Sequence, residues 1–245
     1  MTTAPTDIAT VAVSAYTSVA HSRKEIAPLA IASLTRIQLN PRHPAVRKDL
    51  ADTVGLHKTV MRLAPQNLGE RARERAGVLF RLDEDENGAV LLIQTGDQPD
   101  LQQLPLGYGQ TDTRDLSPMF KALTAGMHVR YRIAANAAKR LRPPAEQEAA
   151  GRSHGKVVPL HGEEAAAWWR RRSAEAGLDV HNVLATDLRP ARARSGAGPR
   201  HELTRFDGTA TITDPEALTA AIVTGIGKGK PYGAGLLSLA PAGRG

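Results

Sequence analysis

The order of the elements expected in the C-terminal half restricts the fold of this chain more than any other feature. Residues 127–133 alternate between apolar and polar side chains, which is typical of a strand with one buried face. Periodicity and capping residues predict the elements that follow: a helix over 162–176, a strand over 180–185, a strand or bent strand pair over 202–213, a helix starting at Asp214-Pro215, and a last strand over 236–240. Strand, helix, strand, strand, helix, strand is the order of a ferredoxin-like unit.

The N-terminal half begins with the same order. Its predicted elements are a strand over 34–40, a helix over 44–64, and strands over 77–82 and 89–95 that Asn87-Gly88 joins as a hairpin. A short helix and an edge strand are further options within 97–115. We therefore expect an α+β fold with two tandem ferredoxin-like (βαββαβ) domains over 31–115 and 116–245, after a poorly ordered extension over 1–30.

The stretches between these elements are expected to be irregular. They are a solvated loop or turn over 71–75, a basic turn over 136–142, a flexible link over 143–155 and an arginine-rich loop over 189–200. Within the helix over 162–176, Trp168 is predicted to belong to the core rather than to serve as a platform for base stacking.

The composition favours an anionic partner and excludes several classes of site. Lys and Arg outnumber Asp and Glu by 32 to 25, and this balance suits a polyanion such as nucleic acid. The chain has no cysteine, which rules out disulfides, thiol nucleophiles and zinc sites of the cysteine type. No cluster of His, Asp and Glu has metal-site spacing, and no apolar stretch approaches the roughly 18 residues of a membrane span. We expect a cytoplasmic protein that uses no cofactor and no metal and binds no membrane.

A glycine-rich stretch lies between the last predicted helix and the last predicted strand. Residues 225–235 hold five glycines, two lysines and one tyrosine. Glycines let backbone N–H groups approach a ligand closely, and Lys228 and Lys230 beside them suit a phosphate backbone. The alternative is a tight turn with solvated lysines. A nucleotide-binding enzyme would need a strand before such a loop and a helix after it, so the order found here argues against that class.

Several segments resemble the CasE family and occur in the same order along the chain. They are the helix with His57, the segment 130–140, Val158-Pro159-Leu160 with the Trp168 helix, and the run 225–241, which is the most specific of them. CasE proteins are the CRISPR repeat-processing endoribonucleases of subtype I-E systems. Over roughly residues 34–241, the resemblance implies two ferredoxin-like domains and binding of the repeat hairpin in precursor crRNA. It also implies metal-independent cleavage at the 3′ base of that hairpin and retention of the product in Cascade, with other Cascade subunits as partners.

The chemistry of such a cleavage is within reach of these residue types. RNA can be cut without a metal ion because its own 2′-hydroxyl can attack the adjacent phosphate. The protein must align the 2′-oxygen with the leaving 5′-oxygen and must move protons, which histidine does best near neutral pH. The products would be a 2′,3′-cyclic phosphate and a 5′-hydroxyl.

His57 falls at the catalytic position of the family. Taken alone, its segment favours a histidine packed on an amphipathic helix, because Leu50, Val54, His57 and Met61 follow at spacings of 4, 3 and 4 residues. With the resemblance, catalysis is the favoured role for His57.

The chain departs from some family members close to this histidine. Those members carry a tyrosine three residues earlier as a proton-transfer partner, where this chain has Val54. His57 would then act with Lys58, Arg62 or the RNA itself, and either as acid or as base. The alternative function is a non-catalytic RNA-hairpin-binding subunit of a ribonucleoprotein that lost efficient chemistry with the tyrosine.

The resemblance also implies contacts with RNA. Relatives often have Arg-Ala-Asn-Pro where this chain has Ala134-Ala135-Asn136-Ala137, so one arginine and one proline are missing. In the stem, contacts with shape and phosphates should dominate over base reading, because the major groove of A-form RNA is deep and narrow. For each basic residue the alternative is a solvated charge. The predicted RNA-binding residues are Lys58, Arg62, Arg130, Arg132, Asn136, Lys139, Arg140, Arg142, Arg192, Arg194, Lys228, Lys230 and Tyr232.

Overall fold

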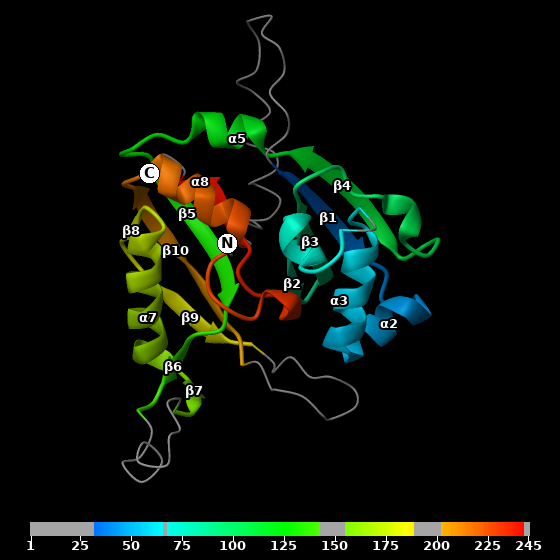
Figure 1. Ribbon diagram of the computed structural model, residues 1–245, viewed down its shortest axis with the longest axis horizontal. Coiled ribbons are helices and arrows are strands. Elements are labelled where there is room, and N and C mark those ends of the chain that lie inside the picture. Colours follow the sequence, from blue (N-terminus) through cyan, green and yellow to red (C-terminus); the bar gives the residue numbers. More distant parts are fainter. Residues whose placement is uncertain (1–31, 66–67, 143–154, 189–201, 243–245) are drawn as a thin grey trace, which may run out of the picture.

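The computed structural model describes residues 32–65, 68–142, 155–188 and 202–242. They form two large antiparallel sheets with helices packed on them, and a two-stranded ribbon (Figure 1). The predictions for the extension 1–30 and the loop 189–200, which includes Arg192 and Arg194, lie outside the described residues, as does nearly all of the link 143–155.

The first sheet has the strand order β2-β3-β1-β4. Its strands are β1 (Ser33–Leu39), β2 (Leu79–Asp85), β3 (Gly88–Thr95) and β4 (Gly109–Asp115). Two helices, α2 (Pro44–Ala51) and α3 (Thr53–Arg62), pack on one face of this sheet, where Ile37, Phe80 and Ile93 share a core with Leu56 and Val60. Between β3 and β4 the second helix of a ferredoxin-like unit is reduced to the short 3-10 turn η1 (Leu101–Gln103).

The second sheet repeats this arrangement with the order β11-β5-β10-β8, and β9 also pairs with β10. Its strands are β5 (His128–Ala135), β8 (Leu178–Val180), β9 (Leu184–Asp187), β10 (Thr204–Ile212) and β11 (Leu237–Pro241), and its helices are α7 (Gly162–Glu175) and α8 (Pro215–Thr224). In both sheets the last strand of the unit lies beside the first, and the third separates the first from the second. The prediction of two tandem ferredoxin-like units is thus confirmed.

The core of the second unit confirms two detailed predictions. Trp168 and Trp169 are buried and stack on Phe206, with ring centroids 6.1 and 5.7 Å from it, so Trp168 is a core residue. Asp214 caps α8, because its carboxylate accepts hydrogen bonds from the backbone N–H groups of Glu216 and Ala217 at 3.0 Å each.

The predicted helix over 44–64 is wrong in one respect: it is two helices that meet at Asp52. The side chain of Asp52 accepts a hydrogen bond from the N–H of Val54 at 3.2 Å and so starts α3 as its N-cap. The buried face of α3 is formed by Leu56, Thr59 and Val60, one step around the helix from the expected face, which leaves His57 half-buried.

Four other segments differ from the expectations. The strand expected over 180–185 is broken into β8 and β9, because the exposed Asn182 bonds Thr209 through both its amide nitrogen (2.8 Å) and its amide oxygen (3.1 Å). Residues expected to be a loop or turn form α4 (Ala72–Arg75) and β6 (Ala138–Arg140). β6 pairs with β7 (Val157–Pro159) in a two-stranded ribbon, and neither β7 nor α5 (Ser117–Ala122) was predicted. Over 202–213, where a strand or a bent strand pair was predicted, the first option is confirmed, because β10 is one continuous strand.

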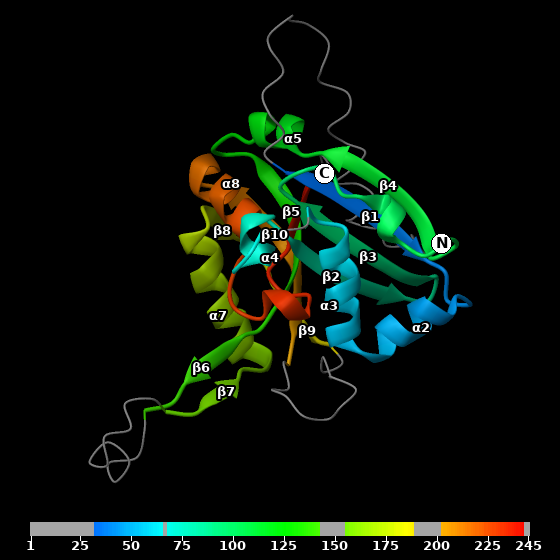
Figure 2. The same cartoon turned by 45° about the vertical axis from the view of Figure 1, so that its right-hand side comes forward.

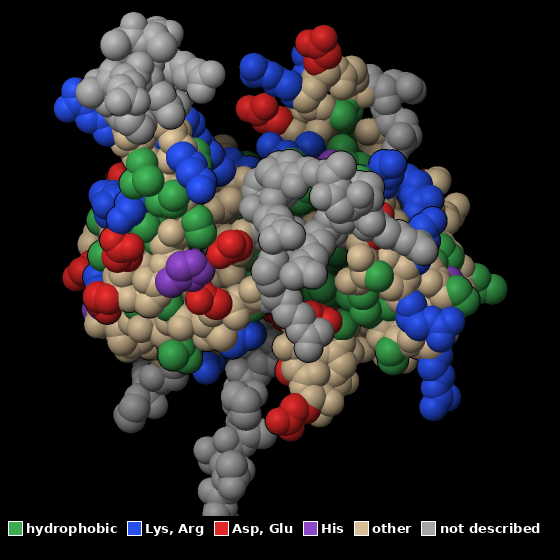
Figure 3. All heavy atoms as spheres, turned by 90° about the horizontal axis from the view of Figure 1, so that it is seen from below, with side chains coloured by type: hydrophobic (Ala, Val, Ile, Leu, Met, Phe, Trp, Pro, Cys, Tyr) green, Lys and Arg blue, Asp and Glu red, His purple; other side chains and the backbone are tan. Residues whose placement is uncertain are grey.

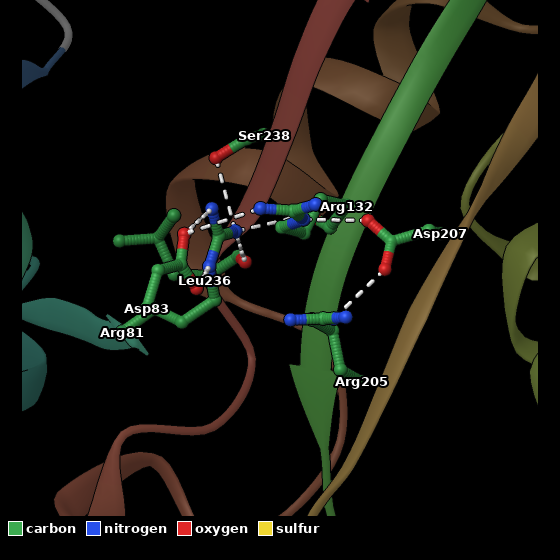
Figure 4. Close-up of polar contacts among 7 residues, drawn as sticks. All are labelled: Arg81, Asp83, Arg132, Arg205, Asp207, Leu236 and Ser238. Atoms are coloured by element: carbon green, nitrogen blue, oxygen red, sulfur yellow. Dashed lines mark hydrogen bonds and ion pairs between the residues drawn. The ribbon is translucent and has the colours of Figure 1, made fainter. Parts of the chain in front are cut away.

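The two units are joined by a continuous core and by a buried ionic network. Leu34, Leu79 and Leu92 on the second face of the first sheet belong to the same hydrophobic cluster as the core of the second unit. Beside them, Arg81 of β2 donates hydrogen bonds to the carbonyl oxygens of Arg132 (3.0 Å) and Leu236 (3.1 Å), as Figure 4 shows. We propose that the domain boundary lies at residues 115 and 116, where β4 ends.

Candidate functional site

His57 lies on α3 with its ring half-buried against the ring of Phe80, at a centroid distance of 6.3 Å. Its Nδ1 is buried and has no hydrogen-bond partner among the described residues. Burial lowers the pKa of His57 below its ordinary value of 6.5, and the charge of Arg73 lowers it further. The imidazole is therefore mainly neutral at pH 7 and can accept a proton.

The glycine loop, residues 225–235, packs against the element that carries His57. The two ends of the loop are joined by a hydrogen bond from the N–H of Ile226 to the carbonyl oxygen of Gly235 (3.0 Å). A second one, from the N–H of Gly235 to the carbonyl oxygen of Ala134 (2.8 Å), fixes the loop to the sheet. Its 3-10 turn η2 (Lys230–Tyr232) contacts both α3 and β2. Figure 2 shows the loop (red) beside α3 and α4 (cyan). The loop and His57, about 170 residues apart in sequence, thus meet at one site.

Phe80 lies between the histidine and the loop. Besides stacking with His57, its ring packs against Gly233, where an added Cβ would lie 3.3 Å from Cε2 of the phenylalanine. Because Gly233 has φ 85°, a side chain there would be strained as well as crowded. The glycine therefore lets the loop approach the ring on which His57 rests.

Arg73, which sequence reasoning did not select, belongs to this site. It lies on α4, is half-buried, and its charge acts on both His57 and Lys230. The sequence offered no signal for it, because Arg73 sits in a stretch with Arg71 and Arg75 that reads as a solvated charge run.

Lys58 and Arg62, predicted to act with His57, lie on another side of α3. Both line a groove of about 670 Å³ whose wall also includes Lys48 and Asp49, and His57 is not among the residues that line it. Arg62 donates a hydrogen bond from Nη2 to Oγ1 of Thr59 at 3.0 Å. We keep RNA binding by Lys58 and Arg62 as a proposal, at a distance from the histidine.

Arg130 and Arg132 project from the face of β5 opposite to the core, as the alternation predicts. Arg132 is engaged with acids: its Nε lies 2.5 Å from Oδ1 of Asp207 and its Nη1 lies 3.9 Å from Oδ2 of Asp83. Its side chain is only 20% exposed. Arg132 could therefore hold the two units together instead of binding RNA. Nε of Arg130 is buried and has no hydrogen-bond partner among the described residues.

The remaining predicted residues are spread over the second unit. Lys139 forms an ion pair with Glu164 at 2.6 Å, and Arg140 donates to the carbonyl oxygen of Gly155 at 3.1 Å, both on the β6–β7 ribbon or beside it. Asn136 lies next to Gly229 of the glycine loop, and Arg142 and Lys228 are exposed. Tyr232 is half-buried on η2. Their RNA contacts remain proposals.

On the face seen from below (Figure 3), basic side chains do not form one uniform surface. In the view from below, Lys and Arg side chains surround the molecule at several places, with acidic side chains between them (Figure 3). On this face, electrostatic attraction of RNA would therefore depend on local groups of cations rather than on a single charged surface.

The described residues include no helix long and apolar enough to cross a membrane. In the same part of the chain, no group of three or more His, Cys, Asp or Glu side chains is placed to hold a metal ion.

The fold and the site define a protein of two tandem ferredoxin-like units with a histidine placed at a glycine-rich loop. A family model described as CRISPR associated protein matches residues 33–241, which include both sheets. The chain belongs to this family of CRISPR-associated proteins, and the resemblance to CasE is confirmed.

This chain matches two CRISPR-associated relatives over nearly the whole of their length. The CRISPR-associated endoribonuclease Cse3 of Thermus thermophilus is 34% identical over 214 residues, covering 85% of this chain and 99% of Cse3. The CRISPR system Cascade subunit CasE of Escherichia coli is 28% identical, covering 78% of this chain and 92% of CasE. The structure of Thermus thermophilus Cse3 bound to an RNA representing a pre-cleavage complex superposes with a TM-score of 0.69 at 32% identity, covering 86% and 99% of the two chains.

Proposed function

We infer that this protein is an endoribonuclease that binds the CRISPR repeat in precursor crRNA and cleaves it, and that it works with other Cascade subunits. Similarity to Cse3 and CasE over most of the chain supports the activity and the partners. The observation that carries the site is His57, half-buried against Phe80 on the helix that contacts the glycine loop, with its pKa lowered by burial. We further propose cleavage at the 3′ base of the repeat hairpin, retention of the product, and a cytoplasmic location.

The reaction can be written with the RNA as its own nucleophile. The 2′-oxygen bonds to the adjacent phosphorus while the bond from phosphorus to the 5′-oxygen breaks. One proton leaves the 2′-hydroxyl and one is delivered to the 5′-oxygen, which gives a 2′,3′-cyclic phosphate and a 5′-hydroxyl. We propose that His57 takes the first proton, because a lowered pKa leaves its imidazole free to accept one at neutral pH.

Cleavage in the presence of EDTA tests the function. The full chain, mixed in excess with a repeat-hairpin RNA, should cut it once and leave a 2′,3′-cyclic phosphate, because no step above uses a metal ion. An RNA with a single 2′-deoxy nucleotide at the cleaved position should bind equally well and stay intact. Cleavage of that deoxy RNA, or a requirement for divalent cations, would contradict the mechanism.

The pH dependence of cleavage should reveal the role of His57. At limiting protein concentration, the second-order rate constant reports the pKa of the free protein. If neutral His57 is the base, this rate constant falls as the pH drops through the pKa of His57, and the midpoint lies below 6.5 because burial and Arg73 lower that pKa. The pH dependence of binding to the 2′-deoxy RNA is measured in parallel, so that a change in binding is not mistaken for titration of the catalytic group. A rate that instead falls as the pH rises through this range would assign His57 as the acid.

Val54 gives specific support to the alternative, a non-catalytic hairpin-binding subunit. Val54 is the second residue of α3 and stands where some relatives have a proton-transferring tyrosine, and its side chain cannot move a proton. Tight binding of the repeat hairpin together with no cleavage by the wild-type protein would establish this alternative.

A further inference from the structure

The side chain of Lys230 lies across the glycine loop to which it belongs. The stem of Lys230 runs past Gly225 and Gly235, where added Cβ atoms would lie 3.1 Å from its Cε and 3.4 Å from its Cγ. Both glycines have positive φ, 76° and 90°, so the turn also needs their backbone freedom. These glycines thus have a packing role: they give the aliphatic part of Lys230 a path over the loop, and Lys230 is half-buried as a result.

Arg73 is fixed in position from two directions. Its carbonyl oxygen accepts from the N–H of Val78 at 2.9 Å, and its Nη1 donates to the oxygen of Val78 at 3.0 Å. Arg71, which precedes α4 as its N-cap, is held at φ 61°, which is rare for a residue with a side chain. The guanidinium of Arg73 is therefore half-buried and held to the chain segment that leads into β2, the strand of Phe80, with donors left over for a ligand.

The positive charges of Arg73 and Lys230 are only partly offset by an acidic side chain. Within the described residues neither Arg73 nor Lys230 forms an ion pair, although the exposed Glu74 partly offsets both charges. Burial lowers the pKa of Lys230, and the charge of Arg73 lowers it further. Arg73 and Lys230 are thus two half-buried cations that repel each other, and Arg73 also disfavours the protonated form of His57. A bound anion would reduce this repulsion.

We propose that Arg73 and Lys230 bind the non-bridging oxygens of the scissile phosphate beside His57, so that a residue of each unit completes the cleavage site. This rests on the proposed function. The phosphate gains negative charge on these oxygens as the 2′-oxygen attacks, and fixed cations stabilise that charge more in the transition state than in the bound RNA. Arg73 can present two N–H groups to one phosphate, while Lys230 acts as a single charge.

Single-turnover cleavage by the full chain tests the proposal. At saturating protein, Arg73→Ala and Lys230→Ala should each slow cleavage about 10²-fold, as removal of one such donor does in other sites. Binding of the 2′-deoxy RNA should weaken far less. Arg73→Lys should recover part of the rate, and the double variant should lose less than the product of the single effects, because both groups act on one phosphate. Arg75→Ala is the matched control, since Arg75 lies on the same helix and is exposed.

Sulfur substitution at the scissile phosphate separates contact from structural support. Sulfur in place of a non-bridging oxygen should slow the wild type, and this slowing should shrink in Arg73→Ala, which has already lost the contact. The proposal is overturned if Arg73→Ala cleaves within about threefold of the wild-type rate, or if sulfur slows this variant as much as it slows the wild type. If Arg73→Ala does not fold, Lys230→Ala decides by the same criteria. Absence of cleavage by the wild type, with the repeat hairpin still bound, would instead reject the proposed function itself.

Discussion

Replacement of His57 by alanine is expected to slow single-turnover cleavage of the repeat hairpin by about 10²- to 10⁴-fold, the usual contribution of a positioned proton-transfer group. The ring is half-buried against Phe80 and its pKa is lowered, so in the free protein it stands ready to accept a proton. The measurement is the cleavage rate in EDTA at saturating protein. The dissociation constant for the 2′-deoxy RNA should change little, because an alanine removes no cation that the RNA needs at neutral pH.

His181→Ala is a suitable control for this variant. His181 is exposed in the second unit and bonds Oγ1 of Thr211 at 2.8 Å, and no role in the site is assigned to it. It should cleave at the wild-type rate. If His57→Ala cuts as fast as this control, the proton is moved by another group and the histidine is only a packing residue of α3.

Local patterns in the sequence were sufficient to predict the order of the elements. The caps at Asp214 and the hairpin at Asn87-Gly88 are set by neighbours within a few residues, and both are found where expected. The break of β8 from β9 could not be predicted in this way, because it depends on Asn182 bonding Thr209, which is 27 residues away. The split at Asp52, by contrast, depends on a local side-chain cap that competes with continued helix, so the prediction missed a signal that the sequence holds.

The site was predicted only in part, for a related reason. His57 and the glycine loop were recognised separately, each by a pattern in its own segment. Their meeting depends on how the two units pack, which no local pattern encodes. Arg73 stands out only once its side chain is seen half-buried near the other two groups, because its own segment looks like a solvated charge run.

The packing of the two units leads to the second large expected effect, which concerns Arg81. This side chain is 1% exposed and makes two hydrogen bonds with Asp83, at 2.8 and 2.9 Å. It also donates to two carbonyl oxygens of the other unit and to Oγ of Ser238 at 3.0 Å. Burial alone would raise the pKa of Asp83, but the charge and hydrogen bonds of Arg81, with Arg132 and Arg205, hold it below its ordinary value.

Arg81→Met is therefore expected to lower the free energy of unfolding by about 3–5 kcal/mol, because it leaves a buried carboxylate with poorer compensation. Denaturant unfolding of the full chain measures this. Arg114→Ala is a close control: Arg114 also pairs with an aspartate two residues away on an edge strand of the same sheet, Asp112 at 3.3 Å, but these side chains are 47% and 49% exposed. Loss of that exposed pair should cost less than about 1 kcal/mol.

A double variant separates the network from the loss of packing volume. Asp83→Asn removes the charge that Arg81 compensates, so Arg81→Met combined with Asp83→Asn should be less destabilised than the sum of the two single changes. If the effects simply add, or if Arg81→Met costs no more than Arg114→Ala, the network contributes little to holding the units together. The meeting of His57 with the glycine loop would then depend on the shared apolar core alone, through Leu34, Leu79 and Leu92.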